Sequence, residues 1–222
     1  MTNCKTLCKI LCMGINDLFL SFEKRRDIEK EKKIKIAQKA LEFINFGEEI
    51  FLGAGTSVSY VGELLAKSPS HFMLKIWTNN IFILNLYLKE YDKFFSENFV
   101  GIVSGEISRK NLSIVNIYLP FSKIDKLIIG TPGFSIKGLS SDDVYTVQQV
   151  EHLIKKAQKI IIVADDTKIG RECIYQTRSM RMIKMDLKNR KEYVLITNNS
   201  SEKKFTSTIK KFKEIGIKVI IV

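Results

Sequence analysis

The stretch Glu49-Ile50-Phe51-Leu52-Gly53-Ala54-Gly55-Thr56-Ser57 decides the fold. Its apolar first half predicts a short buried strand, and its two glycines lead into a helical pattern carried by Val58, Val61, Leu64 and Leu65. A strand that passes through a glycine-rich turn into a helix is typical of α/β proteins. Residues 49–65 therefore predict one βα unit of a mostly parallel sheet.

The same alternation of short apolar runs and helical patterns continues along the rest of the chain. Further strands are expected near residues 73–77, 99–103, 126–129, 160–163, 193–197 and 218–221, and helices near 34–44, 81–88, 144–157 and 202–215. The runs are nearly continuous in apolar residues, as in strands that are buried on both sides. The sequence thus predicts an α/β fold, a mostly parallel twisted sheet with helices on both faces.

Composition excludes several classes of protein. The chain has 222 residues, of which 45% are hydrophobic and 27% charged, so disordered and collagen-like classes are excluded. No apolar run is long enough to span a membrane and no secretory cleavage pattern is present, so we expect a cytoplasmic protein with no membrane partner. Cys4, Cys8 and Cys12 share one helical face without metal-ligand spacing, so no metal site and no disulfide framework are expected.

The net charge of +12 is concentrated in the last third of the chain. Residues 151–222 hold 17 basic and 8 acidic side chains, an excess of +9. Such a surface either attracts phosphates, nucleic acid or acidic partners, or is a lysine-rich solvated surface. The dense charge run at residues 23–35 is typical of a solvated helix face or a linker.

Three polar clusters directly follow predicted strands. They are Gly53–Ser57, Thr78–Asn80 and Ala164–Gly170. Because the carboxyl ends of parallel strands meet at one edge of a sheet, ligands bind there in this class of fold. We therefore expect the three clusters to form one binding site.

The cluster Gly53–Ser57 has the composition of a phosphate-binding turn. Gly53 and Gly55 allow a tight turn and a close approach of an anion to the backbone amides, with Ala54 between them. Thr56 and Ser57 add hydroxyl groups at the start of the predicted helix. The stretch is neither a dinucleotide-binding fingerprint nor a Walker loop. The alternative is a tight strand-to-helix turn with a Ser or Thr N-cap.

Charged residues near the other strand ends suit recognition of an anion. Lys168 is placed to neutralise a phosphate, with Asp165 to hold the lysine or a sugar hydroxyl; the alternative is a polar turn with a surface ion pair. Arg109, in the stretch Ser104–Ser113, is either an anion ligand or a surface arginine in a loop. Thr78 and Asn79 are suited to hydrogen bonds with the hydroxyl groups of a sugar.

Catalysis has little support in the sequence. The two histidines, His71 and His152, do not adjoin a nucleophile motif. We therefore expect a protein that binds its ligand without transforming it and that uses no cofactor.

Several segments in this order resemble the effector-sensing domain of DeoR-family transcriptional regulators, from about Ser21 to Val222. The resemblance is carried by the segments 21–25, 31–37, 50–57, 78–80, 104–109, 112–115, 125–130, 164–170 and 195–198. It implies a fold similar to ribose-5-phosphate isomerase and glucosamine-6-phosphate deaminase, and a phosphorylated sugar as effector. The effector-binding residues that it favours are Gly53, Ala54, Gly55, Thr56, Ser57, Thr78, Asn79, Gly105, Arg109, Asp165 and Lys168.

The resemblance also implies an organisation and an output. Residues 1–30 are expected to form an N-terminal segment and linker-like helix, and residues 31–222 a sensor domain. Members of the family usually carry an N-terminal winged helix-turn-helix, for which residues 1–20 are too few, so contact with DNA is expected to be indirect or weak. The expected protein partner is a second copy of the chain or a full-length relative.

Two other functions stay open at this point. One is a sugar-phosphate isomerase, which needs a carboxylate base near the sugar carbon. The other is a weak electrostatic DNA-binding protein that uses the basic last third, with an affinity that falls steeply with salt.

Overall fold

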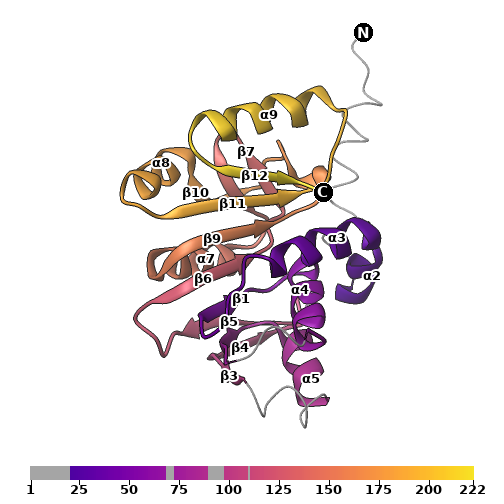
Figure 1. Cartoon of the computed structure of the whole chain (residues 1–222), viewed down its shortest axis with the longest axis vertical. Coiled ribbons are helices and arrows are strands. Elements are labelled where there is room, and N and C mark those ends of the chain that lie inside the picture. The colour runs from indigo at the N-terminus through magenta and orange to yellow at the C-terminus, as the bar shows by residue number, and fades with distance from the viewer. Residues whose placement is uncertain (1–20, 69–72, 90–97, 110) are drawn as a thin grey trace.

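A seven-stranded parallel sheet forms the centre of the molecule (Figure 1). The computed structural model describes residues 21–68, 73–89, 98–109 and 111–222. The strand order is β12-β11-β9-β6-β1-β2-β3, and every neighbouring pair is parallel. The strands are β1 (Glu49–Leu52), β2 (Lys75–Thr78), β3 (Phe99–Ile102), β6 (Ile124–Ile129), β9 (Ala157–Val163), β11 (Glu192–Thr197) and β12 (Lys218–Ile221).

Helices cover both faces of this sheet, which confirms the predicted fold class. One face packs against α3 (Lys30–Leu41), α4 (Thr56–Ala66) and α5 (Ile81–Lys89). The opposite face packs against α7 (Val144–Lys156), α8 (Met180–Lys188) and α9 (Lys203–Glu214). Figure 1 shows α3, α4 and α5 grouped on one side and α8 and α9 on the other.

The alternation of side chains along each strand explains the continuous apolar runs. In β1, Ile50 and Leu52 pack in the α3–α5 layer while Phe51 packs in the α7–α9 layer, and all three are fully buried. In β9, Ile161 and Ile162 divide in the same way. Because both faces are covered, the central positions of these strands favour apolar residues on both sides.

Two small antiparallel sheets were not predicted from the sequence. One has the order β10-β8-β7, formed by β7 (Gly133–Ser135), β8 (Gly138–Ser141) and β10 (Tyr175–Ser179). The other is a hairpin of β4 (Ser104–Ser108) and β5 (Ser113–Tyr118). The hairpin lies against the main sheet through a bridge between Asn80 and Ser113.

The charge run at residues 23–35 forms parts of two helices, α2 (Phe22–Asp27) and α3. The prediction of a solvated face was wrong for Lys33, which is 4% exposed and donates a hydrogen bond from Nζ to the carbonyl oxygen of Arg25 at 2.6 Å. It was also wrong for Arg26, whose guanidinium lies over the rings of Tyr60 and Phe82.

Some predictions fall outside the described residues, namely the helical face of Cys4, Cys8 and Cys12 and the position of His71. Within the described ranges, no helix has the length and apolarity needed to cross a bilayer.

Candidate functional site

Three strand ends meet at one edge of the sheet. Gly53 follows β1, Gly130 follows β6 and Ala164 follows β9, and these strands are neighbours in the order β9-β6-β1. A Cβ atom on Gly130 would lie 3.8 Å from the carbonyl oxygen of Val163 and 4.0 Å from that of Ala54. Gly130 therefore lies between the turns at 53–57 and 164–170, and these turns share one edge, as predicted.

The turn at residues 53–57 leaves the N-terminus of α4 open. Gly53 donates its amide to the carbonyl oxygen of Ile128 at 2.9 Å, and a Cβ there would lie 3.0 Å from Cγ2 of Ile129. Gly55, with φ +119°, is the N-cap residue, and no side chain caps the helix. The alternative of a Ser or Thr N-cap is therefore wrong. The first amide groups of α4 carry a partial positive charge that favours an anion.

The turn after β9 is held by its own side chains. Asp165 is 3% exposed and caps the short 3₁₀ helix Asp166–Lys168 by accepting hydrogen bonds from the amide of Thr167, at 3.1 Å, and from its hydroxyl group. The amide of Lys168 donates to the carbonyl oxygen of Asp165 at 3.0 Å. The carboxylate of Asp165 therefore stabilises the backbone conformation of the turn that contains Lys168.

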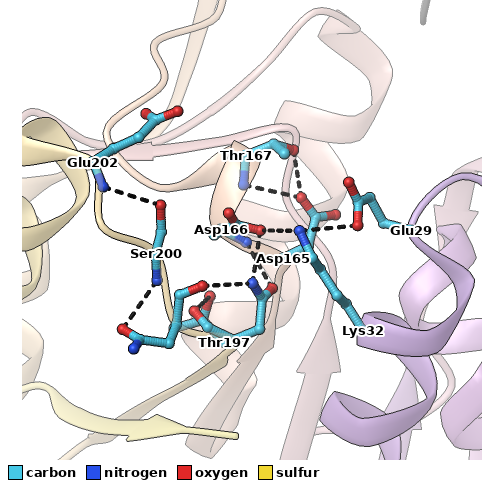
Figure 2. Close-up of polar contacts among 10 residues, drawn as sticks. Glu29, Lys32, Asp165, Asp166, Thr167, Thr197, Ser200 and Glu202 are labelled. Carbon is cyan, nitrogen blue, oxygen red and sulfur yellow. Dashed lines mark hydrogen bonds and ion pairs between the residues drawn. The ribbon is translucent and has the colours of Figure 1, made fainter.

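The second carboxylate of this turn, Asp166, binds two other elements (Figure 2). Lys32 of α3 donates from Nζ to Oδ1 of Asp166 at 3.0 Å and lies 2.9 Å from Oε2 of Glu29. Asn198, which follows β11, donates from Nδ2 to Oδ1 of Asp166 at 2.7 Å. The hydrogen bond to Glu29, followed by the interactions with Asp166, raises the pKa of Lys32 against the opposing effect of burial. Lys32 is thus held in its charged form.

The sequence reasoning missed Lys32 as a contributor to this region. Lys32 lies in a dense charge run, where nothing distinguishes it from its neighbours. Its partner Asp166 is 134 residues away in the sequence. Asn198 carried a usable signal, since it is a polar residue directly after a buried strand.

Thr78 and Asn79 lie at the end of β2, and their side chains are used within the protein. The hydroxyl of Thr78, 1% exposed, donates to the carbonyl oxygen of Leu52 at 2.7 Å and accepts from the amide of Asn80 at 3.0 Å. Nδ2 of Asn79 donates to the carbonyl oxygen of Ile114 and to Oε1 of Gln149. Oδ1 of Asn79 is buried and has no hydrogen-bond partner among the described residues.

Gly105 and Arg109 lie on the β4–β5 hairpin and not at a strand end of the main sheet. A Cβ on Gly105 would lie 2.3 Å from the carbonyl oxygen of Val115, so packing alone explains a glycine there. Arg109 is exposed and directly follows β4. Neither residue belongs to the converging turns themselves, and their part in binding stays a prediction.

The described residues form cavities of different sizes. A small one of about 10 Å³, enough for about one water molecule, lies at the end of β6 beside Gly130, Thr131 and Pro132. A larger groove of about 380 Å³ lies between β5 and α7, lined by Asn116, Ile117, Gln148, Gln149, Glu151, His152 and Lys155. The described part of the chain holds no cluster of three or more residues suited to a metal ion.

A sequence model for the family described as "DeoR C terminal sensor domain" matches residues 28–186, more than half of the chain. Among curated proteins, the chain is 29% identical over 157 residues to a lactose phosphotransferase system repressor of Streptococcus mutans, covering 69% of this chain and 60% of that protein. It is 26% identical to the glycerol-3-phosphate regulon repressor of Escherichia coli, covering 72% of this chain and 62% of that protein. The chain thus spans less than two thirds of the length of these relatives.

Among solved structures, one similar protein is ribose 5 phosphate isomerase A from Neisseria gonorrhoeae. The TM-score is 0.45 at 17% identity, over 62% of this chain and 52% of the isomerase.

Proposed function

The chain belongs to the DeoR family through its C-terminal sensor domain, and from that premise we propose that the turns at 53–57 and 164–170 bind a phosphorylated sugar whose binding changes transcription. The observation that carries this proposal is the convergence of the two turns on either side of Gly130 at one sheet edge. The uncapped amides of α4 supply donors for a phosphate, and Lys168 supplies positive charge on the other side.

The small cavity at the end of β6 cannot hold a sugar phosphate. Space inside the β6 end is limited to about one water molecule, so the sugar would lie on the solvent side of the turns. Ala54, Gly55, Thr56 and Lys168 are all partly exposed, so a ligand can reach them from the solvent.

The proposed role is regulatory and not enzymatic. The relatives named above are repressors. The two carboxylates of the turn at 164–170 already have partners: Asp165 bonds to Thr167, and Asp166 to Lys32 and Asn198. An isomerase instead needs a carboxylate that is free to move a proton. The signal would arise because the ligand binds one of two conformations or oligomeric states more tightly than the other.

The names of the relatives suggest the class of effector. One acts on a lactose phosphotransferase system and another on a glycerol-3-phosphate regulon. We therefore propose an intermediate of carbohydrate metabolism that carries one phosphate group. We further propose that DNA is reached through a winged helix-turn-helix, supplied by a longer form of the chain or by a full-length relative.

A thermal-shift screen tests this proposal. The panel consists of ribose 5-phosphate, fructose 6-phosphate, galactose 6-phosphate and glycerol 3-phosphate, each paired with its unphosphorylated form. A ligand at 100 times its Kd stabilises the folded state by about 2.7 kcal/mol, which is a readily measured increase in Tm. We expect a response to at least one phosphorylated compound and none to its unphosphorylated partner. Equal responses to both forms, or none at all, would refute the proposal.

A further inference from the structure

The N-terminal helices α2 and α3 contact both halves of the proposed effector site. At the first half, Lys32 of α3 donates to Oδ1 of Asp166 at 3.0 Å (Figure 2). In the sequence, Asp166 lies between Asp165 and Lys168, in the turn after β9. The side chains of this pair are only partly exposed, 36% for Lys32 and 17% for Asp166, so solvent screens their interaction less than that of a fully exposed pair.

At the second half, Arg26 of α2 reaches the beginning of α4. Nε of Arg26 donates to Oγ of Ser59 at 3.0 Å, and that hydroxyl group donates to the carbonyl oxygen of Thr56 at 2.7 Å. Thr56 is the first residue of α4 and belongs to the turn at 53–57. The guanidinium also forms an ion pair with Glu63 and lies 4.0 Å from the ring centroid of Tyr60. A short chain of contacts therefore joins α2 to the proposed phosphate-binding turn.

The two helices that make these contacts, α2 and α3, are held together as one unit. Glu29, between α2 and α3, has a left-handed backbone with φ 53° and ψ 35°. The buried side chain of Lys33 fastens α3 to the carbonyl oxygen of Arg25 in α2 at 2.6 Å. The hydrogen bond from Lys33 to Arg25 fixes α2 relative to α3. A displacement of either turn of the site would therefore be transmitted to both helices.

We propose that Lys32 and Arg26 are positioning residues of the effector site, and that occupancy of the site is coupled through them to helices α2 and α3. This inference rests on the proposed function. A ligand that neutralises Lys168 changes the charge balance of the turn that contains Asp166, and so changes the strength of the pair with Lys32. By reciprocity, a change in α2–α3 alters the affinity for the ligand by the same factor.

Lys32→Met removes the ion pair and keeps most of the side chain. Lys39→Met is the matched control, because Lys39 lies on the same helix and pairs with Glu42 at 2.7 Å, outside the network around Asp166. Hydrogen–deuterium exchange of the ligand-free proteins is the first readout. We expect exchange at residues 166–170 to be about fivefold or more faster in Lys32→Met than in the wild type, and unchanged in Lys39→Met. Asp166→Asn, which removes the charge from the other side, should act in the same direction.

The second readout separates coupling from simple stabilisation. The four phosphorylated compounds of the thermal-shift panel and inorganic phosphate are added as probes. In the wild type, the probe that binds should alter exchange in residues 22–33; this response should be lost in Lys32→Met and restored in Lys32→Arg. Affinity for the probe should fall about fivefold in Lys32→Met.

Two results would overturn the inference. One is unchanged exchange at residues 166–170 in the ligand-free Lys32→Met protein. The other is a probe response in residues 22–33 that is equal in the wild type and in Lys32→Met. If no phosphorylated probe binds the wild type, the proposed function and the coupling to occupancy both fail, whereas the ligand-free comparison still decides whether Lys32 positions the turn.

Discussion

Asn198 and Asp166 exchange two hydrogen bonds across the ends of adjacent strands. The backbone amide of Asp166 donates to Oδ1 of Asn198 at 3.0 Å, and Nδ2 of Asn198 donates to Oδ1 of Asp166 at 2.7 Å. Since Asn198 is 6% exposed, water replaces these bonds poorly. The turn that carries Lys168 is therefore fastened to β11 as well as to α3.

Asn198→Ala removes both bonds and leaves the amide of Asp166 without this acceptor. We expect the free energy of unfolding to fall by about 1–3 kcal/mol, measured by urea denaturation. Asn199→Ala, at the exposed neighbouring position, is the control and should change it by less than about 0.5 kcal/mol. Equal losses in the two variants would show that the paired bonds do not stabilise the turn.

Lys168→Met removes a positive charge that we assign to the proposed phosphate site. Charge-assisted hydrogen bonds contribute about 1.5–3 kcal/mol, so the affinity for the best phosphorylated sugar should fall by about tenfold or more, measured by titration calorimetry. Lys159→Met serves as control, because Lys159 lies near the opposite end of β9, where it pairs with Glu192 at 2.9 Å. A Lys168→Met protein that binds as tightly as the control would exclude this lysine from the site.

Gly105→Ala distinguishes a packing role from an effector-binding role. The added methyl group would lie 2.3 Å from the carbonyl oxygen of Val115, so the free energy of unfolding should fall by about 1–3 kcal/mol. Ser104→Ala, an exposed neighbour, should have little effect. Affinity for a phosphorylated sugar should stay unchanged in the Gly105→Ala protein that remains folded. A loss of affinity would instead support the role that the family resemblance implies for Gly105.

The ion pair between the partly buried Glu48 and the buried Lys126 makes stability depend on pH. Burial opposes ionisation of Glu48, but hydrogen bonds from Lys126 and from Asn45 more than offset it, so its pKa lies below the ordinary value of 4.5. The unfolded state therefore binds the proton more readily. The stabilisation from this pair is complete above pH 4.5 and is lost as the pH falls through the folded-state pKa.

Glu48→Gln should remove that part of the acid sensitivity. At pH 7 it should destabilise the protein by about 3 kcal/mol, because Lys126 stays buried without its counter-charge. Below pH 4 the difference from the wild type should shrink. Urea denaturation between pH 7 and pH 3 measures both effects, with Glu42→Gln as an exposed control. If the difference in the free energy of unfolding between the wild type and Glu48→Gln stays constant over this pH range, the linkage is contradicted.

The main sheet and its strand ends were predictable because burial on both faces leaves continuous apolar runs. The stretch at residues 49–57 gave β1 and the start of α4 directly. Strand β4 of the hairpin has no such apolar run, since four of its five residues are exposed, including Ile107 at 73%.

Helix α8 was missed for another reason. Its buried face includes Asp186, a carboxylate that breaks the apolar period. Asp186 is buried because Arg178 donates two hydrogen bonds to it, at 2.9 and 2.6 Å, and Tyr193 donates a third. This pairing joins three elements, so no local pattern reveals it.

The site was predictable only in part. The positions of the turns follow from strand ends, which are local features. The contacts of Lys32 with Asp166 and of Arg26 with Ser59 join residues far apart in the sequence, and a lysine in a charge run carries no sign of its distant partner. Such contacts emerge only when the topology is known.

Amide chemical shifts, recorded by ¹⁵N NMR during titration with phosphorylated sugars, test the central claim most directly. We predict saturable shifts at residues 53–57 and 165–170 with at least one phosphorylated sugar, and none with the same sugar lacking the phosphate. Saturable shifts confined to the groove between β5 and α7, around Asn116 and His152, would place the effector elsewhere and contradict the account.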